Sequence, residues 1–313
     1  MAPFKILISD GLDESGKAVL RAAGDVADRD GISAADLLTE VADCDALIVR
    51  GRTKVTPAVF EAGKKLKVVG RAGIGVDNID LSAAKAAGVH VVNSPLATTV
   101  TVAELALGLM LSMVREIPRA DAAMKAGKWI KKELEGVELY GKTLGVIGFG
   151  RIGVAVGKRA AAFDMQVIGY DPYKPAEAIR ADGGEPVSLD ELIARADFIT
   201  LHLPLTPQTK NMLGSDAFAR MKTGVYIVDA ARGGVIDEEA LLAALESGKV
   251  AGAGLDVFNA EPPGLTALVA HPHVVATPHI GAQTVEAQAR AGYDISTEIV
   301  AALKGEPLRW KVA

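Results

Sequence analysis

The sequence predicts an α/β protein made of two doubly wound domains, each built on a parallel β-sheet. Short apolar runs alternate with helix-like segments through residues 1–93, as buried parallel strands and their crossover helices do. The runs are Phe4–Ile8, Ala46–Val49, Lys67–Val69 and Val89–Val92. A second β-α-β pattern, at residues 143–171, contains a glycine-rich turn. At 313 residues, the chain is long enough for two domains with separate cores.

The glycine-rich turn has the spacing of a dinucleotide-binding motif. An apolar strand, Thr143–Ile147, runs into Gly148-Phe149-Gly150-Arg151-Ile152-Gly153, and a helix is predicted from Val154 to Ala162. In this motif Gly148 makes the tight turn, Gly150 admits the pyrophosphate, and Gly153 lets the helix pack against the strand. The start of the helix, next to Arg151 and Ile152, would then face the phosphates.

The cofactor expected at this turn is NAD. A second apolar run, Met165–Tyr170, ends at Asp171. The carboxylate of Asp171 would accept hydrogen bonds from the adenosine ribose hydroxyls and repel a 2′-phosphate, which favours NAD over NADP. Lys174 is a nearby cation that weighs against this preference. The alternative interpretation of Asp171 is a turn residue before Pro172.

Composition excludes several other classes. The formal net charge is −5 and the chain has no long basic tract, which argues against a nucleic-acid partner. Cys44 is the only cysteine, so an intrachain disulfide is excluded and a reducing compartment fits. The longest uncharged apolar stretch, Leu105–Val114, is about half the ~20 residues of a membrane helix. No signal peptide is evident, so a cytoplasmic protein without membrane attachment is expected.

The order of the segments predicts one domain inserted into another. After Asn93-Ser94-Pro95 the chain should cross to a Rossmann-type domain, residues 98–284. Its later strands are predicted at Phe198–Leu201, Val225–Val228, Ala253–Val257 and Val274–Ala276, and its later helices at Leu189–Arg195, Asp216–Arg220 and Asp237–Glu246. A final helix, Thr284–Lys304, should return to a flavodoxin-like substrate domain, residues 1–97 and 285–313.

One predicted helix, residues 101–115, is apolar on nearly every face. Such a helix must be buried, either in a large core or between subunits. We therefore expect a homodimer with this helix near the interface. The basic segment Lys125–Lys132, around Trp129, is either a solvated helix face or a segment that overhangs a neighbour's cleft.

Arginines and glycines follow two strand ends of the first domain. They occur in Val49-Arg50-Gly51-Arg52 and in Gly70-Arg71-Ala72-Gly73-Ile74-Gly75. Ligands of open α/β sheets gather at the carboxyl ends of strands, so these are candidate anion contacts. Solvated strand ends with turn glycines are the alternative, and these residues alone do not decide between the two.

Three polar segments follow the late strands of the second domain, at residues 230–234, 256–263 and 277–281. They supply an arginine, carboxylates and an imidazole. Oxidation of an alcohol moves a proton as well as a hydride, and imidazole suits the proton transfer at neutral pH. Among the five histidines, His279 is favoured because it follows a strand beside a glycine. The remaining ones are interpreted as structural (His90), at the edge of the cofactor cleft (His202), or in a loop without a third metal ligand (His271 and His273), so no metal is expected.

At these residues the chain resembles the D-isomer-specific 2-hydroxyacid dehydrogenases. The resemblance rests on the turn at 148–153, Ala231-Arg232-Gly233-Gly234, Asp256-Val257-Phe258 with Glu261-Pro262-Pro263, and Thr277–Gly281. It covers essentially the whole chain. The segments Val49-Arg50, Lys54-Val55-Thr56, Val69–Gly73, Gly75–Asn78 and Gly127-Lys128-Trp129 resemble the members that oxidise 3-phosphoglycerate.

The resemblance implies a role for each matching residue. His279 would be the acid/base, Glu261 its partner, and Arg232 the group that orients the carboxylate and carbonyl of the substrate. The backbone around Gly73, Ile74 and Gly75 would hold the carboxylate, and the phosphate would be bound by Arg50, Arg71 and Lys131, the last from the dimer mate. Asp256 would touch the nicotinamide carboxamide, and the other cofactor contacts would include Pro204, Ala230 and Gly281.

The expected activity is therefore NAD-dependent oxidation of D-3-phosphoglycerate to 3-phosphohydroxypyruvate, a step of serine biosynthesis. Reduction of glyoxylate or hydroxypyruvate, or oxidation of another anionic D-2-hydroxy acid, is the alternative within enzymes. An NAD-sensing, corepressor-like binding protein is the alternative class. Many members with this pattern carry a C-terminal regulatory extension, whereas this sequence stops at Ala313, so we expect a truncated chain or a short form. An additional Arg52 could retune the anion preference.

Overall fold

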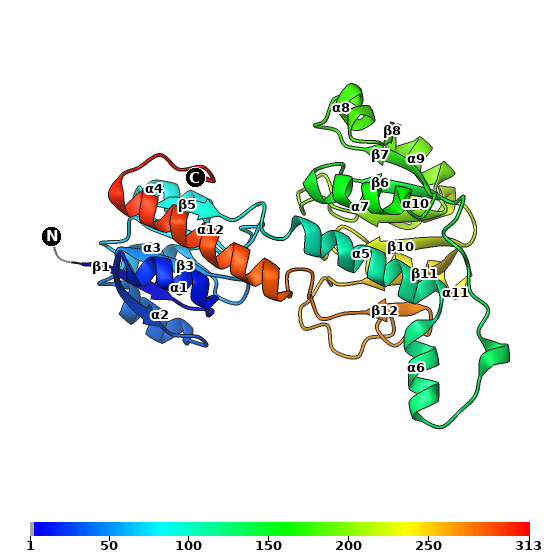
Figure 1. The fold of residues 1–313 in the computed structure, drawn as a ribbon, viewed down its shortest axis with the longest axis horizontal. Coiled ribbons are helices and arrows are strands. Elements are labelled where there is room, and N and C mark those ends of the chain that lie inside the picture. The colour runs from blue at the N-terminus through cyan, green and yellow to red at the C-terminus, as the bar shows by residue number, and fades with distance from the viewer. Residues whose placement is uncertain (1–2) are drawn as a thin grey trace. The chain divides into compact units, whose positions relative to one another are not determined.

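The structure is a computed structural model that describes residues 3–313 (Figure 1). It forms two compact units, one of residues up to Thr98 together with Ala282–Ala313, and the other of Thr99–Gly281. Residues 1 and 2, which the sequence assigned to the first domain, lie outside the described residues. Each unit has one parallel β-sheet between two layers of helices, so the predicted fold class is confirmed.

The sheet of the first unit has the order β2-β1-β3-β4-β5, which is the flavodoxin-like order. Its strands are β1 (Phe4–Ile8), β2 (Gly24–Asp28), β3 (Ala46–Val49), β4 (Val68–Arg71) and β5 (His90–Asn93). One face packs against α1 (Glu14–Arg21) and α12 (Val285–Lys304), which lie side by side in Figure 1. The other face packs against α2 (Ala34–Val41), α3 (Pro57–Ala62) and α4 (Leu81–Ala87).

The sheet of the second unit has the order β12-β11-β10-β9-β6-β7-β8. Its strands are β6 (Thr143–Ile147), β7 (Gln166–Tyr170), β8 (Glu185–Pro186), β9 (Phe198–Leu201), β10 (Val225–Asp229), β11 (Val250–Leu255) and β12 (Val274–Ala276). The strand order reverses between β6 and β9. In doubly wound folds ligands bind at this point, outside the carboxyl ends of the strands.

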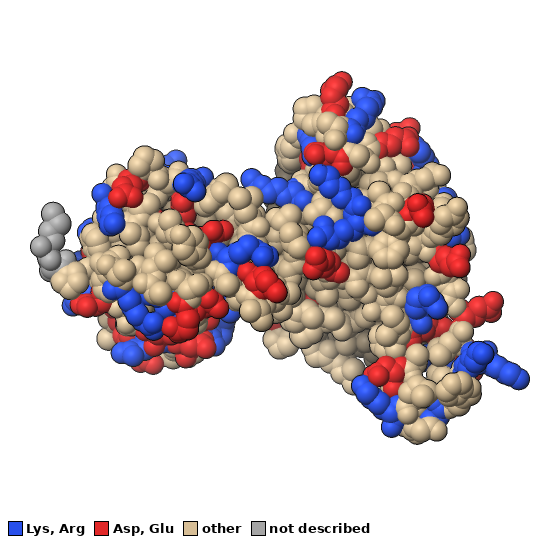
Figure 2. Space-filling view, viewed as in Figure 1, with Lys and Arg blue, Asp and Glu red and all other residues tan. Residues whose placement is uncertain are grey.

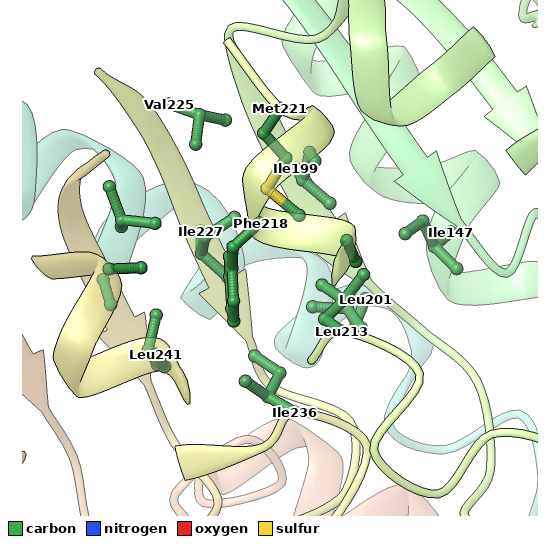
Figure 3. Close-up of a cluster of buried hydrophobic side chains, with 14 of the residues drawn as sticks. Ile147, Ile199, Leu201, Leu213, Phe218, Met221, Val225, Ile227, Ile236 and Leu241 are labelled. Carbon is green, nitrogen blue, oxygen red and sulfur yellow. The ribbon is translucent and has the colours of Figure 1, made fainter. Parts of the chain in front are cut away.

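Helices cover both faces of the second sheet. One face packs against α5 (Thr99–Val114) and α7 (Arg151–Ala161). The other packs against α9 (Leu189–Arg195), α10 (Ser215–Arg220) and α11 (Glu238–Glu246), where side chains such as Ile227, Phe218 and Leu241 form the core shown in Figure 3. The short helix α8 (Ala176–Ala181) precedes β8 at the edge of the sheet. Buried apolar contacts on both faces explain why most strands are continuous apolar runs.

The helix predicted to be buried on every face is only partly covered within its own unit. The inner side of α5 packs against the sheet and α7, but Val100, Glu104 and Gly108 form an exposed stripe along it. The next helix, α6 (Ile117–Lys125), has no buried residue, and the segment after it, with η1 (Lys131–Glu133), extends away from the sheet (Figure 1).

Element boundaries differ from the sequence prediction where the apolar signal is weak or displaced. The helix after the glycine-rich turn begins at Arg151 rather than Val154, because the second half of the motif is already helical. Strand β11 begins at Val250, earlier than predicted, since Gly252 and Gly254 interrupt its apolar run. Strand β2 was not predicted at all: it lies at a sheet edge and has no fully buried residue.

No helix within residues 3–313 combines the length and apolarity that crossing a membrane requires. On the face shown in Figure 2, basic side chains are interspersed with acidic ones rather than gathered into one extended tract.

Candidate active site

The three glycines of the turn after β6 have different surroundings. Gly148 has a positive φ of +89°, and a Cβ there would lie 2.5 Å from the carbonyl oxygen of His202. A Cβ on Gly153 would lie 2.2 Å from the Gly148 carbonyl oxygen. A Cβ on Gly150 would meet no described atom within 4 Å. The protein itself therefore requires the first and third glycines, whereas the space beside the middle one is open to a ligand.

The start of α7 offers hydrogen-bond donors at the same place. Gly150 is its N-cap residue, and no side chain caps the helix. The backbone N–H groups of the first turn therefore remain available, and the positive end of the helix dipole favours an anion there. Arg151 is exposed and Ile152 half-buried on this first turn. These residues fit the pyrophosphate of a dinucleotide.

The two carboxylate oxygens of Asp171 have different surroundings. Its Oδ1 accepts a hydrogen bond from the Tyr173 backbone N–H, 2.9 Å, so it does form a turn. Its Oδ2 has no protein donor among the described residues and is available to the ribose hydroxyls. The ammonium group of Lys174 is not paired with the Asp171 carboxylate. Its Nζ instead donates to the Phe149 carbonyl oxygen at 2.9 Å and to Asp182 Oδ2 at 2.6 Å.

His279 and Glu261 form a close pair at the carboxyl edge of the second sheet. The His279 Nδ1 lies 2.7 Å from the Glu261 Oε2. Because an ionised carboxylate only accepts hydrogen bonds, Nδ1 carries a proton in this contact and Nε2 is the free ring nitrogen. The imidazole is 45% exposed, so Nε2 is accessible to a substrate. Glu261 precedes a cis proline peptide and also accepts from the Phe258 N–H at 3.2 Å.

Asp256 holds the loop that carries His279. Its buried carboxylate accepts hydrogen bonds from the Thr277 hydroxyl at 2.7 Å, the Ile280 N–H at 2.7 Å and the Gly281 N–H at 2.8 Å. His279 itself has a left-handed backbone, φ +52°, which these bonds on either side stabilise. Burial raises the pKa of Asp256, and the three donors oppose that shift.

Arg232 follows β10 in a loop organised by Asp229. The Asp229 Oδ1 accepts from the Ala231 N–H at 2.8 Å, and the Arg232 Nη1 donates to the Ala231 carbonyl oxygen at 2.6 Å. Asp229 is not among the site residues predicted from the sequence. The signal was present, since an acid that ends the apolar strand Val225–Asp229 in a doubly wound sheet lies at the ligand-binding edge.

Burial raises the pKa of Asp229 to about 7 against two backbone hydrogen bonds that lower it. Because the folded-state pKa lies above the unfolded one, Asp229 contributes stability at low pH that is lost as the pH rises from about 4 to 7. The difference in free energy of unfolding between Asp229→Asn and the native protein should therefore change by roughly 2–3 kcal/mol in favour of the variant as the pH rises from 5 to 8. Urea unfolding at the two pH values measures this gain. Asp216→Asn, at an exposed position, is the control, and an equal change in both variants would refute the effect.

The other predicted cofactor contacts lie at the same sheet edge. Pro204 is exposed in the loop after β9, Ala230 directly follows β10, and Gly281 ends the loop bound by Asp256. The carbonyl group of His202 lies against Gly148 of the glycine-rich turn. Burial lowers the pKa of His202 to about 3, so the ring is neutral and unsuited to proton transfer at neutral pH.

The arginines of the first unit are held by a buried polar network. Asp10, just after β1, accepts from the Arg50 N–H at 2.7 Å, and the Asn78 Nδ2 donates to the Arg50 carbonyl oxygen at 3.0 Å. The Arg71 Nε donates to the same oxygen at 3.4 Å, and its guanidinium lies against Gly73, where a Cβ would come within 1.9 Å of Nη1. The structure therefore brings Arg50, Arg71 and Gly73 together. The sequence pattern did not reveal Asp10 or Asn78 as their supports.

The loop 73–75 offers fewer free amides than the sequence suggested. The Gly73 N–H already donates to Ser94 Oγ at 2.7 Å. The Ile74 and Gly75 N–H groups have no protein acceptor among the described residues, and the Asn93 Nδ2 holds the Ile74 carbonyl oxygen at 2.6 Å. Lys131 belongs to the other unit, where it is exposed at the start of η1.

The remaining histidines are not part of the carboxyl edge of the second sheet. His90, interpreted from the sequence as structural, is exposed at the start of β5, because the apolar residues that flank it point to the core. His271 and His273 have ring centroids 5.7 Å apart. Within residues 3–313 no group of three or more potential ligands is arranged to hold a metal ion.

An accessible imidazole paired with a carboxylate lies at the same sheet edge as a turn shaped for a dinucleotide, with an arginine just after a strand between them. These are the parts that coupled proton and hydride transfer requires. The fold and this edge together define a class, the NAD-dependent dehydrogenases.

Comparison with known proteins identifies the family within that class. Residues 107–281 match the family described as D-isomer specific 2-hydroxyacid dehydrogenase, NAD binding domain. The chain belongs to this family.

Two curated relatives illustrate the similarity. The chain is 51% identical to D-3-phosphoglycerate dehydrogenase of Methanocaldococcus jannaschii over 96% of its own length and 58% of that enzyme. It is 48% identical to D-3-phosphoglycerate dehydrogenase of Homo sapiens over 97% of its length and 57% of that enzyme. The chain thus spans between half and two thirds of the length of these relatives.

Solved structures of similar size share the whole fold. A protein from Thermus thermophilus superposes with a TM-score of 0.91 at 34% identity, over 99% of this chain and all of that one (100%). A glyoxylate reductase from Paecilomyes thermophila superposes with a TM-score of 0.90 at 33% identity, over 100% of this chain and 99% of that one.

Proposed function

We propose that the protein oxidises D-3-phosphoglycerate to 3-phosphohydroxypyruvate with NAD, and thereby serves serine biosynthesis. The contact between His279 and Glu261, 2.7 Å, carries the chemical part of this proposal, because it leaves one ring nitrogen free to accept a proton. The substrate is supported by 48–51% identity to D-3-phosphoglycerate dehydrogenases over nearly the whole chain. Identity to the glyoxylate reductase is lower, 33%.

The residues of the second unit would divide the reaction between them. NAD held at the glycine-rich turn would supply the acceptor for the hydride on C2 of the substrate. As the C2–H bond breaks, His279 Nε2 accepts the proton of the C2 hydroxyl, so that a carbonyl group forms and charge balances. Glu261 stabilises the imidazolium that results, and Asp256 fixes the loop in which His279 lies. Arg232 binds the carboxylate, and its planar fork aligns C2 with the ring nitrogen.

We propose that the first unit is the substrate domain. The free N–H groups of Ile74 and Gly75 would bind the carboxylate of the substrate. Arg50 and Arg71, fixed by Asp10 and Asn78, would bind the phosphate, which needs two or more positive donors to replace its hydration. Arg52 donates to Asp30 Oδ1 at 2.9 Å and to the Ser9 carbonyl oxygen at 3.0 Å. Its guanidinium group is therefore bound to acceptors of the protein itself.

A panel of acids tests the substrate assignment. With NAD in excess, kcat/KM should be highest for 3-phosphoglycerate and lower for glycerate, lactate and, in the reverse direction, glyoxylate. Arg50→Gln should lower kcat/KM for the phosphorylated acid by about 10- to 100-fold, the usual worth of a charge-assisted contact, and leave glycerate nearly unchanged. Arg29→Gln, which breaks a surface pair with Glu40, is the matched control. If glycerate is oxidised as well as its phosphate, the assignment of Arg50 and Arg71 is wrong.

We also propose a homodimer that buries the exposed stripe of α5 and the segment of α6 and η1. Large apolar side chains are exposed there, with Ile117 at 50%, Met124 at 57% and Trp129 at 78%. A second copy of the chain would cover them, and Lys131 of the partner subunit would then contribute to the phosphate site. Light scattering at micromolar concentration should give twice the chain mass, and Met124→Glu should shift this towards the monomer. A native protein that is monomeric at that concentration would contradict the proposal.

The single cysteine, Cys44, is buried and unpaired. A free thiol of this kind suits a reducing compartment, which is the basis for proposing a cytoplasmic protein.

A further inference from the structure

The side chain of Lys174 braces the dinucleotide-binding turn from within its own unit. Its Nζ donates to the Phe149 carbonyl oxygen at 2.9 Å and lies 5.4 Å from the centroid of the Phe149 ring. Phe149 is the residue between the first two glycines of the motif. The ammonium group is therefore attached to the backbone that must fit the pyrophosphate, although Lys174 lies on the loop after the neighbouring strand β7.

The Phe149 ring is fixed by a pocket whose walls are glycines. The ring is fully buried. A Cβ on Gly169 of β7 would lie 2.4 Å from its Cδ2, and one on Gly184 would lie 2.5 Å from its Cζ. No larger residue fits at either position without moving the ring, so the close packing of Phe149 holds one side of the turn.

The hydrogen bond from Lys174 determines the direction of the next amide. The Phe149 carbonyl and the Gly150 N–H belong to one planar peptide unit and point in opposite directions. With the carbonyl bound to Lys174, the Gly150 N–H is directed to the other side of that plane. A Cβ on Gly150 would meet no described atom within 4 Å, so the open space for a ligand adjoins this peptide.

Asp182 keeps Lys174 in this position. Its Oδ2 lies 2.6 Å from the Lys174 Nζ, and the ammonium side chain is only 21% exposed. Asp182 is the C-cap residue of α8, where a carboxylate is disfavoured by the helix dipole. The hydrogen bond from Lys174 offsets this and lowers the pKa of Asp182, so the partner stays ionised. Lys174 is thus bound on two sides, three residues after Asp171.

We infer that Lys174 is a positioning residue for the dinucleotide turn, and that Asp182, by holding Lys174 there, keeps its charge away from the ribose 2′ position and strengthens the preference for NAD over NADP. Asp171 excludes a 2′-phosphate by repulsion. The pair Lys174–Asp182 adds a second contribution to the preference for NAD, because a cation close to the ribose 2′ position is what NADP-binding sites of this fold use. The same lysine would otherwise be available to a 2′-phosphate.

Equilibrium binding to the full chain tests the inference without reference to turnover. The dissociation constants of NADH and NADPH are measured from the fluorescence of the bound nicotinamide. Lys174→Met, which keeps the aliphatic stem, should weaken NADH about tenfold and give NADPH no advantage, since one charge-assisted hydrogen bond to the turn is lost. Asp182→Ala should release Lys174 and raise the affinity for NADPH relative to NADH about three- to tenfold. In the double variant that gain should disappear.

Lys158→Met is the matched control. Lys158 is an exposed lysine on α7 that acts on Asp182 through space but has no hydrogen bond to the turn. Lys158→Met changes the net charge by the same amount as Lys174→Met. Because it removes no hydrogen bond to the turn, it should leave both dissociation constants within about twofold of the native values. The inference is overturned if Lys174→Met binds NADH as the control does, or if Asp182→Ala leaves the ratio of the two dissociation constants unchanged. Thermal unfolding of each variant shows whether it is folded.

Discussion

Replacing His279 with alanine should lower kcat by about 10²- to 10⁴-fold, the usual worth of general acid–base catalysis. The imidazole is the only group that the proposed reaction uses to accept the hydroxyl proton. The contact of its Nδ1 with Glu261 Oε2, 2.7 Å, keeps it in the competent orientation. NADH should bind the variant almost as tightly as the native protein, because the turn at 148–153 and Asp171 are unchanged. Steady-state rates and NADH fluorescence titration measure the two effects separately.

His90→Ala is the control for this variant, since His90 is exposed at the start of β5 in the other unit. It should retain native kcat. Glu261→Gln should lie between the two, because an amide still orients the ring but no longer stabilises its positive charge. A His279 variant with near-native kcat would show that another group moves the proton.

Arg232→Gln should lower kcat/KM by about 10²- to 10³-fold for every 2-hydroxy acid, phosphorylated or not. The carboxylate and the hydroxyl at C2 are common to all these substrates, and the proposed role of Arg232 is to grip that end. Glutamine can supply one hydrogen bond but neither the charge nor the planar fork. Arg232→Lys should recover only part of the loss, because the charge returns without the second hydrogen bond.

The control is Arg220→Gln, which removes an exposed arginine paired with Asp190 on the same unit. It should leave kcat/KM unchanged. A loss confined to phosphorylated acids would move Arg232 to the phosphate site and contradict the proposed role. Native kinetics in Arg232→Gln would remove it from the mechanism.

The sheets were predictable because their strands are buried on both faces. Strands β1, β3, β6 and β9 begin and end where the apolar runs do. The two strands that were missed, β2 and β8, are at the edges of their sheets, where a strand is partly solvated. Gly24–Asp28 contains two acidic residues and only one larger apolar side chain, Val26, and its extended conformation comes from pairing with β1 along its whole length.

The nucleotide-binding turn was predictable because its parts are neighbours in the sequence. Gly148, Gly150 and Gly153 have local roles, and the structure shows the close contacts that fix the first and third of them. The caps of α11 and α12, Asp237 and Thr284, likewise depend only on the next turn of helix.

Residues that act across the sheet were not predictable in the same way. Asp10 binds a loop 40 positions away, and Asn78 and Lys174 support the site by donating to backbone carbonyl oxygens, a role that no sequence motif marks. The sequence presented Lys174 as a cation that weakened the preference for NAD. Its engagement by Asp182 depends on the fold of α8 beside β7, so only the structure reveals it.

Transfer of deuterium from C2 of the substrate tests the proposed reaction most directly. D-3-phosphoglycerate labelled with deuterium at C2 is incubated with NAD and the full chain, and the keto acid is trapped with hydrazine so that product accumulates. The mechanism predicts NADH one mass unit heavier by mass spectrometry, and a much slower appearance of the label with His279→Ala. Unlabelled NADH, no NADH at all, or label that appears equally fast without His279 would contradict it.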